Sequence, residues 1–300
     1  MNEKRRNALV RRIQELWPLM PATLYLLGSL LIVLSYLVGL SFSVSSVEWS
    51  RFPTLEPFRR VLSMQEFWEA LANTTVFMLI GTPLELAAGL ILALLLYRSF
   101  RARNFVRSLL IIPLAIPALV TATVLFILFD YPGGHINHLL LGSYDWVPAL
   151  LEAPIDWRAR KSLALGVSML GKVWRDMPIS MLILSAGLNA IDPELFDAAR
   201  TMGAGFRRRV FTIVIPLILP SIASVVLLRS LEMWKEFIFP FVLAGRYNLL
   251  GTLIESLYNH WGRANEAAVV ALALVLCIIV STALLMWLLG LVRKVLIRGS

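Results

Sequence analysis

The amino-acid sequence predicts an all-α, polytopic membrane protein with six transmembrane helices. Its 300 residues are 58% hydrophobic and only 16% charged, whereas a soluble chain of this length carries about 25% charged residues. The Lys and Arg residues fall between long apolar runs, which is the pattern of membrane topology rather than of a nucleic-acid-binding face. We therefore expect lipid to surround most of the apolar side chains, and we expect no nucleic-acid partner.

Six apolar segments are long enough to cross about 30 Å of hydrocarbon, which takes about 20 helical residues. The predicted spans are 19–44, 70–97, 108–130, 162–188, 211–242 and 267–292. Charged residues and prolines interrupt the fourth and fifth, and Pro216 and Pro220 are expected to distort the start of the fifth. In this scheme 1–18 and 293–300 are tails, 45–69 is an outer segment, and the transmembrane core occupies 70–292.

The distribution of basic residues predicts which side of the membrane each connection faces. With a cytoplasmic N-terminus, sixteen of the 28 Lys and Arg residues lie in inner segments, as the positive-inside pattern requires. Both termini are therefore predicted to be cytoplasmic. The basic stretch KRRNALVRR resembles the front of a signal peptide, but the apolar run after it is too long and lacks a small-residue cleavage site. We expect a retained membrane anchor.

One inner segment, 189–210, has the pattern of a short amphipathic helix followed by a turn. Asp192 suits the N-cap and Pro193 the first turn. Gly203 and Gly205 can supply the bend, and a second helix with three arginines then leads back to the membrane. Apolar residues recur along one side of the first helix at helical spacing: Leu195, Phe196, Ala199 and Met202.

The spacing within this loop resembles that of the binding-protein-dependent ABC importer permeases. Those proteins carry Glu-Ala-Ala, a Gly four places after the second Ala, and then Ile-x-Leu-Pro. Here the order is Asp197-Ala198-Ala199, Gly203 and Ile213-Val214-Ile215-Pro216, so Asp replaces Glu and Ile replaces Leu. The runs NTTVFMLIGTPLELAAGLILALLL and IIPLAIPALV also resemble the family, over roughly residues 61–293. The first span and basic tail look like those of the sugar-importer branch, most like the maltose-type first permease.

The resemblance implies an ABC type I importer fold and inward transport of a sugar or sugar-like solute by alternating access. The solute could also be a polyol, glycoside or sugar phosphate. The implied partners are a second permease in a heterodimer, a cytoplasmic ABC ATPase dimer that holds ATP and Mg, and an extracytoplasmic solute-binding protein. The implied location is the bacterial or archaeal cell inner membrane, and no cofactor is expected in this chain.

The resemblance also implies that the loop is the coupling helix that docks on the ATPase. Asp197 would make a charge contact, Ala199 would allow close packing and Gly203 would form the bend. The residues predicted for coupling are Pro193, Phe196, Asp197, Ala198, Ala199, Met202 and Gly203.

Charged residues within the fourth and fifth spans are the second group of functional candidates, because ionisable side chains in a membrane are costly and usually face a cavity or a partner. Lys172 and Asp176 are spaced to pair at i,i+4, and Arg229 and Glu232 at i,i+3. Tryptophan rings beside acids suit a sugar, because rings stack on its apolar faces while polar groups bind its hydroxyls. The predicted pathway residues are Trp174, Arg175, Asp176, Glu232, Trp234 and Glu236. Alternatively, these charges pair with one another or with a second subunit to hold the bundle together.

Two other classes of function stay open at this stage. In an ion-coupled secondary transporter, intramembrane acids such as Glu85 or Glu232 would bind protons or sodium, but six spans are few and no inverted repeat is visible. A membrane-embedded enzyme ranks last, since no Walker loop, G-x-S-x-G or H-E-x-x-H motif occurs. The single cysteine, Cys277, excludes a disulfide framework. No metal site is expected, because His135 and His138 lack a third ligand.

Overall fold

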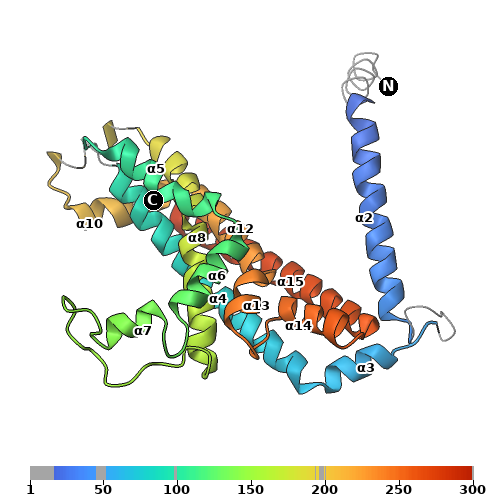
Figure 1. Cartoon of the computed structure of the whole chain (residues 1–300). Helices are drawn as coiled ribbons and strands as arrows, with labels where there is room; N and C mark the ends of the chain where they lie inside the picture. Colours follow the sequence, from blue (N-terminus) through green and yellow to red (C-terminus); the bar gives the residue numbers. More distant parts are fainter. Residues whose placement is uncertain are drawn as a thin grey trace, which may run out of the picture.

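The computed structural model describes residues 17–44, 52–97, 100–192, 194–195, 199 and 201–298, and in this part of the chain every regular element is a helix. Figure 1 shows a bundle of long helices that crosses the view diagonally, with α2 standing apart at one edge. The elements are η1 (Trp17–Leu19), α2 (Met20–Ser41), α3 (Glu56–Ser63), α4 (Gln65–Tyr97), α5 (Arg103–Ala115), α6 (Ala118–Leu128), α7 (His135–Leu140), α8 (Lys161–Asn189), α10 (Phe206–Arg209), η2 (Val210–Val214), α11 (Ile215–Leu217), α12 (Leu219–Trp234), α13 (Ile238–Leu243), α14 (Leu250–Glu255), η3 (Ser256–His260) and α15 (Ala264–Arg298).

Helices lie at all six predicted positions, but they are not six straight apolar spans. Within the described ranges, three segments are long and apolar enough to cross a membrane, and two bent pairs raise the number to five. The fourth predicted span is α8, which is continuous but carries charged residues at its centre. The boundaries also shift. α4 begins five residues before the predicted 70, and the predicted tail 293–300 is helical as far as Arg298.

Prolines account for the bends. α5 and α6 meet at 93°, with Pro113 inside α5 and Pro117 at the N-cap of α6. Proline lacks a backbone N–H and clashes with the preceding helical turn. The fifth predicted span bends by 73° at the start of α12, where Pro216 and Pro220 were expected to distort it. It breaks again between α12 and α13, so the fifth predicted span, 211–242, consists of several shorter helices.

The packed centre of the bundle lies where α4, α8 and α12 meet. Glycines on α4 allow the neighbouring backbones to approach closely. A Cβ atom at Gly89 would lie 2.6 Å from the Cβ of Ser180 on α8, and one at Gly81 would lie 2.7 Å from the side chain of Met233 on α12. Buried apolar side chains fill the remaining space on either side of this crossing, including Phe77, Met181, Leu184, Val225 and Met233.

Helix α2 joins this bundle at one end. It packs against α15, and the buried Asn265 side chain donates hydrogen bonds to the carbonyls of Leu40 (2.9 Å) and Ser43 (2.7 Å). The rest of α2 is largely exposed and apolar, which suits a surface in contact with lipid tails.

Candidate functional site

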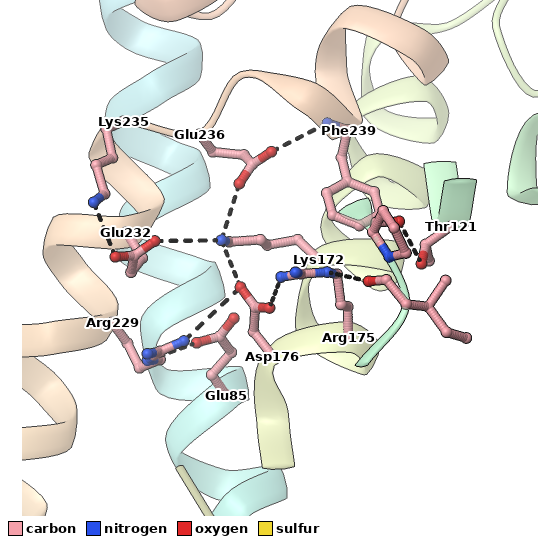
Figure 2. Close-up of polar contacts among 12 residues, drawn as sticks. Glu85, Thr121, Lys172, Arg175, Asp176, Arg229, Glu232, Lys235, Glu236 and Phe239 are labelled. Carbon is pink, nitrogen blue, oxygen red and sulfur yellow. Dashed lines mark hydrogen bonds and ion pairs between the residues drawn. The ribbon is translucent and has the colours of Figure 1, made fainter. Parts of the chain in front are cut away.

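Eight charged side chains lie together where α4, α8 and α12 meet, and Figure 2 shows them pointing toward one another. We call this set the charge network. It contains four acids and four bases, and therefore no net formal charge: Glu85, Asp176, Glu232, Glu236, Lys172, Arg175, Arg229 and Lys235.

Lys172 lies at the centre of the charge network. Its Nζ is 2.6 Å from Asp176 Oδ2, which confirms the pair expected from i,i+4 spacing on α8. The same nitrogen lies 3.0 Å from Glu236 Oε2 and 3.9 Å from Glu232 Oε2. The other oxygen of Glu236 accepts a hydrogen bond from the backbone N–H of Phe239 at 3.1 Å, in the first turn of α13. Lys172 thus connects α8 to both sides of the break between α12 and α13.

Arg229 lies on the interior face of α12, which overturns one sequence prediction. Its Nε is 3.5 Å from Glu85 Oε2, and its Nη1 is 3.8 Å from Asp176 Oδ2. Glu232, the predicted partner of Arg229, pairs with Lys235 at 3.0 Å instead. The physical reason is burial. Glu85 is fully enclosed, and a buried carboxylate needs a nearby cation.

Arg175 links the charge network to the bend between α5 and α6. Its Nη1 lies 2.5 Å from Asp176 Oδ1, and its Nε donates to the carbonyl of Ile116 at 3.3 Å. That carbonyl belongs to the C-cap residue of α5, whose extended backbone interrupts the helical hydrogen bonds. Arg175 therefore compensates a backbone acceptor that a straight helix would have satisfied.

Solvent reaches the predicted pathway residues unequally. Asp176, Trp234 and Glu236 are buried, while Arg175 and Glu232 are partly exposed. Trp174 is 41% exposed and lines an apolar groove of about 420 Å³ between α6 and α8, together with Thr121, Val124, Leu170 and Gly171. The structure thus brings Arg175, Asp176, Glu232 and Glu236 into one network and leaves the two tryptophans outside it. Sequence reasoning left Lys172, Arg229 and Lys235 out of the predicted site, although their i,i+3 and i,i+4 spacing to acids was visible.

The inner loop is described in part. Pro193, Phe196, Asp197 and Ala198 lie outside the described residues, so their predicted coupling roles have no structural counterpart here. The carboxylate of Asp192 accepts the backbone N–H of Glu194 at 3.0 Å, as an N-cap does.

The end of the loop helix has the expected bend. Gly203 has φ +76°, and the N–H of Ala204 donates to the carbonyl of Ala199 at 3.0 Å, which is the C-terminal cap formed by a left-handed residue. Ala199 is buried, whereas Met202 is 87% exposed. The loop therefore ends in a fixed turn that presents an apolar side chain.

A lobe formed by α7 and the chain that follows it was not recognised from the sequence, and we call it the outer lobe after the side on which the predicted topology places it. Buried Asn137 organises it. Its Nδ2 donates to the carbonyls of Asp130 and Ile155, each at 3.1 Å, and its Oδ1 accepts from the N–H of Ile155 and from Trp157 Nε1. Its partners lie up to 20 residues away, so no local pattern marks it.

Across the described residues, no group of His, Cys, Asp or Glu is placed to hold a metal ion.

Comparison with known proteins bears on this arrangement. Residues 85–298 match the family model described as the binding-protein-dependent transport system inner membrane component. The trehalose/maltose transport system permease protein MalF of Thermococcus litoralis is 28% identical over 212 residues, covering 70% of this chain and 69% of that protein. The sulfoquinovosyl glycerol transport system permease protein SmoG of Agrobacterium fabrum is 30% identical over 273 residues, covering 87% and 86%.

The fold also has solved counterparts. A chain from a bacterial ABC transporter involved in the import of the acidic polysaccharide alginate superposes with a TM-score of 0.77 at 18% identity, covering 94% of this chain and 98% of that one. The overall helical arrangement of this chain is thus similar to that of the alginate transporter chain.

Proposed function

Because the chain belongs to the family of binding-protein-dependent transport system inner membrane components, we propose that it is the permease subunit of an ATP-driven importer for a sugar or sugar-like solute. The main support for this proposal is the match of residues 85–298 to the family, since the matched region includes the charge network, the inner loop and α15. The relatives are named for trehalose, maltose and a sulfoquinovosyl glycerol. A carbohydrate, polyol, glycoside or sugar phosphate therefore fits this chain.

In the proposed topology the chain crosses the membrane six times with both termini in the cytoplasm. α2, α4, α8 and α15 and the two bent pairs form the six crossings. The basic stretch at the N-terminus and the three arginines of α10 then lie on the cytoplasmic side, in agreement with the positive-inside pattern. The inner loop and the outer lobe around Asn137 lie on opposite sides.

The inner loop is proposed to couple this chain to a cytoplasmic ATPase dimer that binds ATP and Mg. Two features support this role: the fixed turn at Gly203 and the exposed side chain of Met202 beside it. A rigid helix end transmits a displacement to α12, whereas a flexible loop absorbs it. Asp197, Ala198, Ala199, Pro193 and Phe196 complete the proposed contact on the basis of the sequence.

The solute pathway is proposed to run along α8 and α12, between this chain and a second permease subunit. Trp174 supplies an exposed ring for stacking, and Glu232 and Lys235 supply polar groups at the exposed side of the charge network. Charged side chains at this position in a bundle are compatible with an aqueous cavity or a protein partner, but not with lipid. An extracytoplasmic binding protein would deliver the solute from the side of the outer lobe.

The first test is copurification of the tagged chain from detergent, followed by reconstitution with the proteins that stay bound. An ATPase and a second permease in comparable amounts are expected, with ATP-dependent sugar uptake that requires a binding protein. Uptake that survives loss of the ATPase and collapses with the proton gradient would refute the proposal. It would favour the ion-coupled secondary transporter, with Glu85 or Glu232 as the ion site.

A further inference from the structure

The break between α12 and α13 separates two packing units. α12 packs against α4, α8 and α15, whereas α13 packs against α6 and α8. α12 ends at Trp234, and Lys235 is its C-cap residue. Phe237 has φ −131° and ψ −49°, which lies outside the helical region. Residues 235–237 thus form a joint, and α8 contacts the units on both sides of it.

One cation on α8 lies within reach of one acid from each unit (Figure 2). Lys172 Nζ is 3.0 Å from Glu236, which caps the first turn of α13, and 3.9 Å from Glu232 on α12. The two acids are four residues apart, about one helical turn. Asp176 and Lys172, which lie 2.6 Å apart, both belong to α8, so they move together when α8 shifts against the other helices.

We infer that Lys172 is a positioning residue that exchanges its interhelical partner between Glu236 and Glu232 during the transport cycle. This inference rests on the proposed function, because it assigns the exchange to the change from one access state to the other. The described structure is the Glu236 state. When α8 moves along α12 toward its N-terminal end, Lys172 pairs with Glu232 instead, and the α12–α13 joint is released.

The exchange leaves no buried charge without a polar partner, which a single ion pair would not allow. In the Glu236 state, Glu232 is held by Lys235 at 3.0 Å. In the Glu232 state, Glu236 retains the N–H of Phe239, and the Lys235 ammonium is free to enter solvent because its side chain is already 58% exposed. Packed elements that move relative to one another have discrete arrangements rather than a continuous range, because closely packed interfaces are bistable.

The test measures the joint directly in the complete complex reconstituted with its ATPase. Spin labels on exposed α12 and α13 positions, Leu228→Cys and Phe241→Cys in a Cys277→Ser background, report the distance across the joint. Wild type should show two distances whose proportions change when ATP and vanadate trap the ATPase. Glu232→Gln should favour the present distance by about tenfold, and Glu236→Gln should favour the other by a similar factor.

Matched variants separate this switch from a merely structural role. Glu66→Gln changes an exposed acid at the start of α4 and should leave the proportions unchanged. Glu232→Asp retains the carboxylate charge on a shorter side chain. It should therefore shift the proportions of the two distances in the same direction as Glu232→Gln, by a smaller factor.

A structural role predicts that both Gln variants loosen the joint alike. A shift in the same direction, or no shift, would overturn the exchange while ATP-driven uptake by the wild type persists. Absence of that uptake would overturn the proposed function and the exchange together.

Discussion

The carboxylate of Glu85 lies 3.5 Å from the guanidinium of Arg229, and the two residues are only 0% and 2% exposed. Removing one member of a buried ion pair costs about 3–5 kcal/mol, because it leaves the other charge unpaired. We expect Arg229→Gln to lower the unfolding free energy of the complex by an amount in this range, measured by thermal denaturation in detergent.

The double variant Glu85→Gln/Arg229→Gln tests the same pair without leaving a charge behind. It should recover much of the lost stability, with a coupling energy of about 1–3 kcal/mol between the two positions. Additive losses from the two single variants would show that Arg229 is held by Asp176 rather than by Glu85.

Gly203 provides a test of the inner loop with a matched control two residues away. At Gly203 a Cβ would meet nothing within 4 Å, but φ is +76°, and that conformation costs about 1–2 kcal/mol for other residues. Gly205 also has open space, but its φ is −63°. Gly203→Ala should therefore weaken ATPase binding by about tenfold, with Gly203→Pro more severe and Gly205→Ala unchanged. Equal retention of the ATPase by the two Ala variants would contradict the coupling role.

The approach of α4 to α8 at Gly89 predicts a stability difference between two glycines. A Cβ at Gly89 would lie within 3.0 Å of backbone atoms of Ser180 and Met181, whereas one at Gly166 on α8 would meet nothing within 4 Å. Gly89→Ala should cost about 1–3 kcal/mol through overpacking, and Gly166→Ala should be neutral or up to about 1 kcal/mol stabilising through helix propensity. Melting temperatures of the purified variants measure both effects, and equal values would mean that α4 and α8 are less closely packed than described.

Asn137 predicts how the outer lobe responds to proteolysis. Its replacement by Ala removes four hydrogen bonds, to Asp130, Ile155 and Trp157, each worth about 0.5–1.5 kcal/mol. The exposed basic residues Arg158, Arg160 and Lys161 should then be cleaved faster by trypsin. Asn259→Ala, at an exposed site, is the control. Unchanged cleavage rates would show that the lobe is ordered by other contacts.

Local patterns in the sequence predicted the features that depend on neighbouring residues. Apolar run length located the helices, and helical spacing identified the Lys172–Asp176 pair. The prolines before α12 indicated its distortion, and the glycine pattern indicated the turn at Gly203. Each of these features is determined by residues within a few helical turns of one another, so a local sequence pattern is enough to predict it.

The features that the sequence did not reveal depend on contacts between distant segments. Arg229 was assigned to Glu232, three residues away, but it packs against Glu85 from a different helix. Asn137 bonds across the outer lobe in a similar way. The sharp bend between α5 and α6 was also missed, because Pro113 and Pro117 lie in a run apolar enough to suggest one straight span.

The attachment of α2 at its C-terminal end has a mechanical consequence. The last turn of α2 is held by Asn265, and the rest of its length is largely exposed among the described residues of this chain. The angle of α2 can therefore follow the surrounding bilayer. A helix of 22 residues is about 33 Å long, and it adapts to a thinner or thicker membrane by tilting. The resulting force acts on the contact of α2 with Asn265, whereas α4 is packed against both α8 and α12. We therefore expect a change in bilayer thickness to alter the tilt of α2 more than the geometry around Lys172.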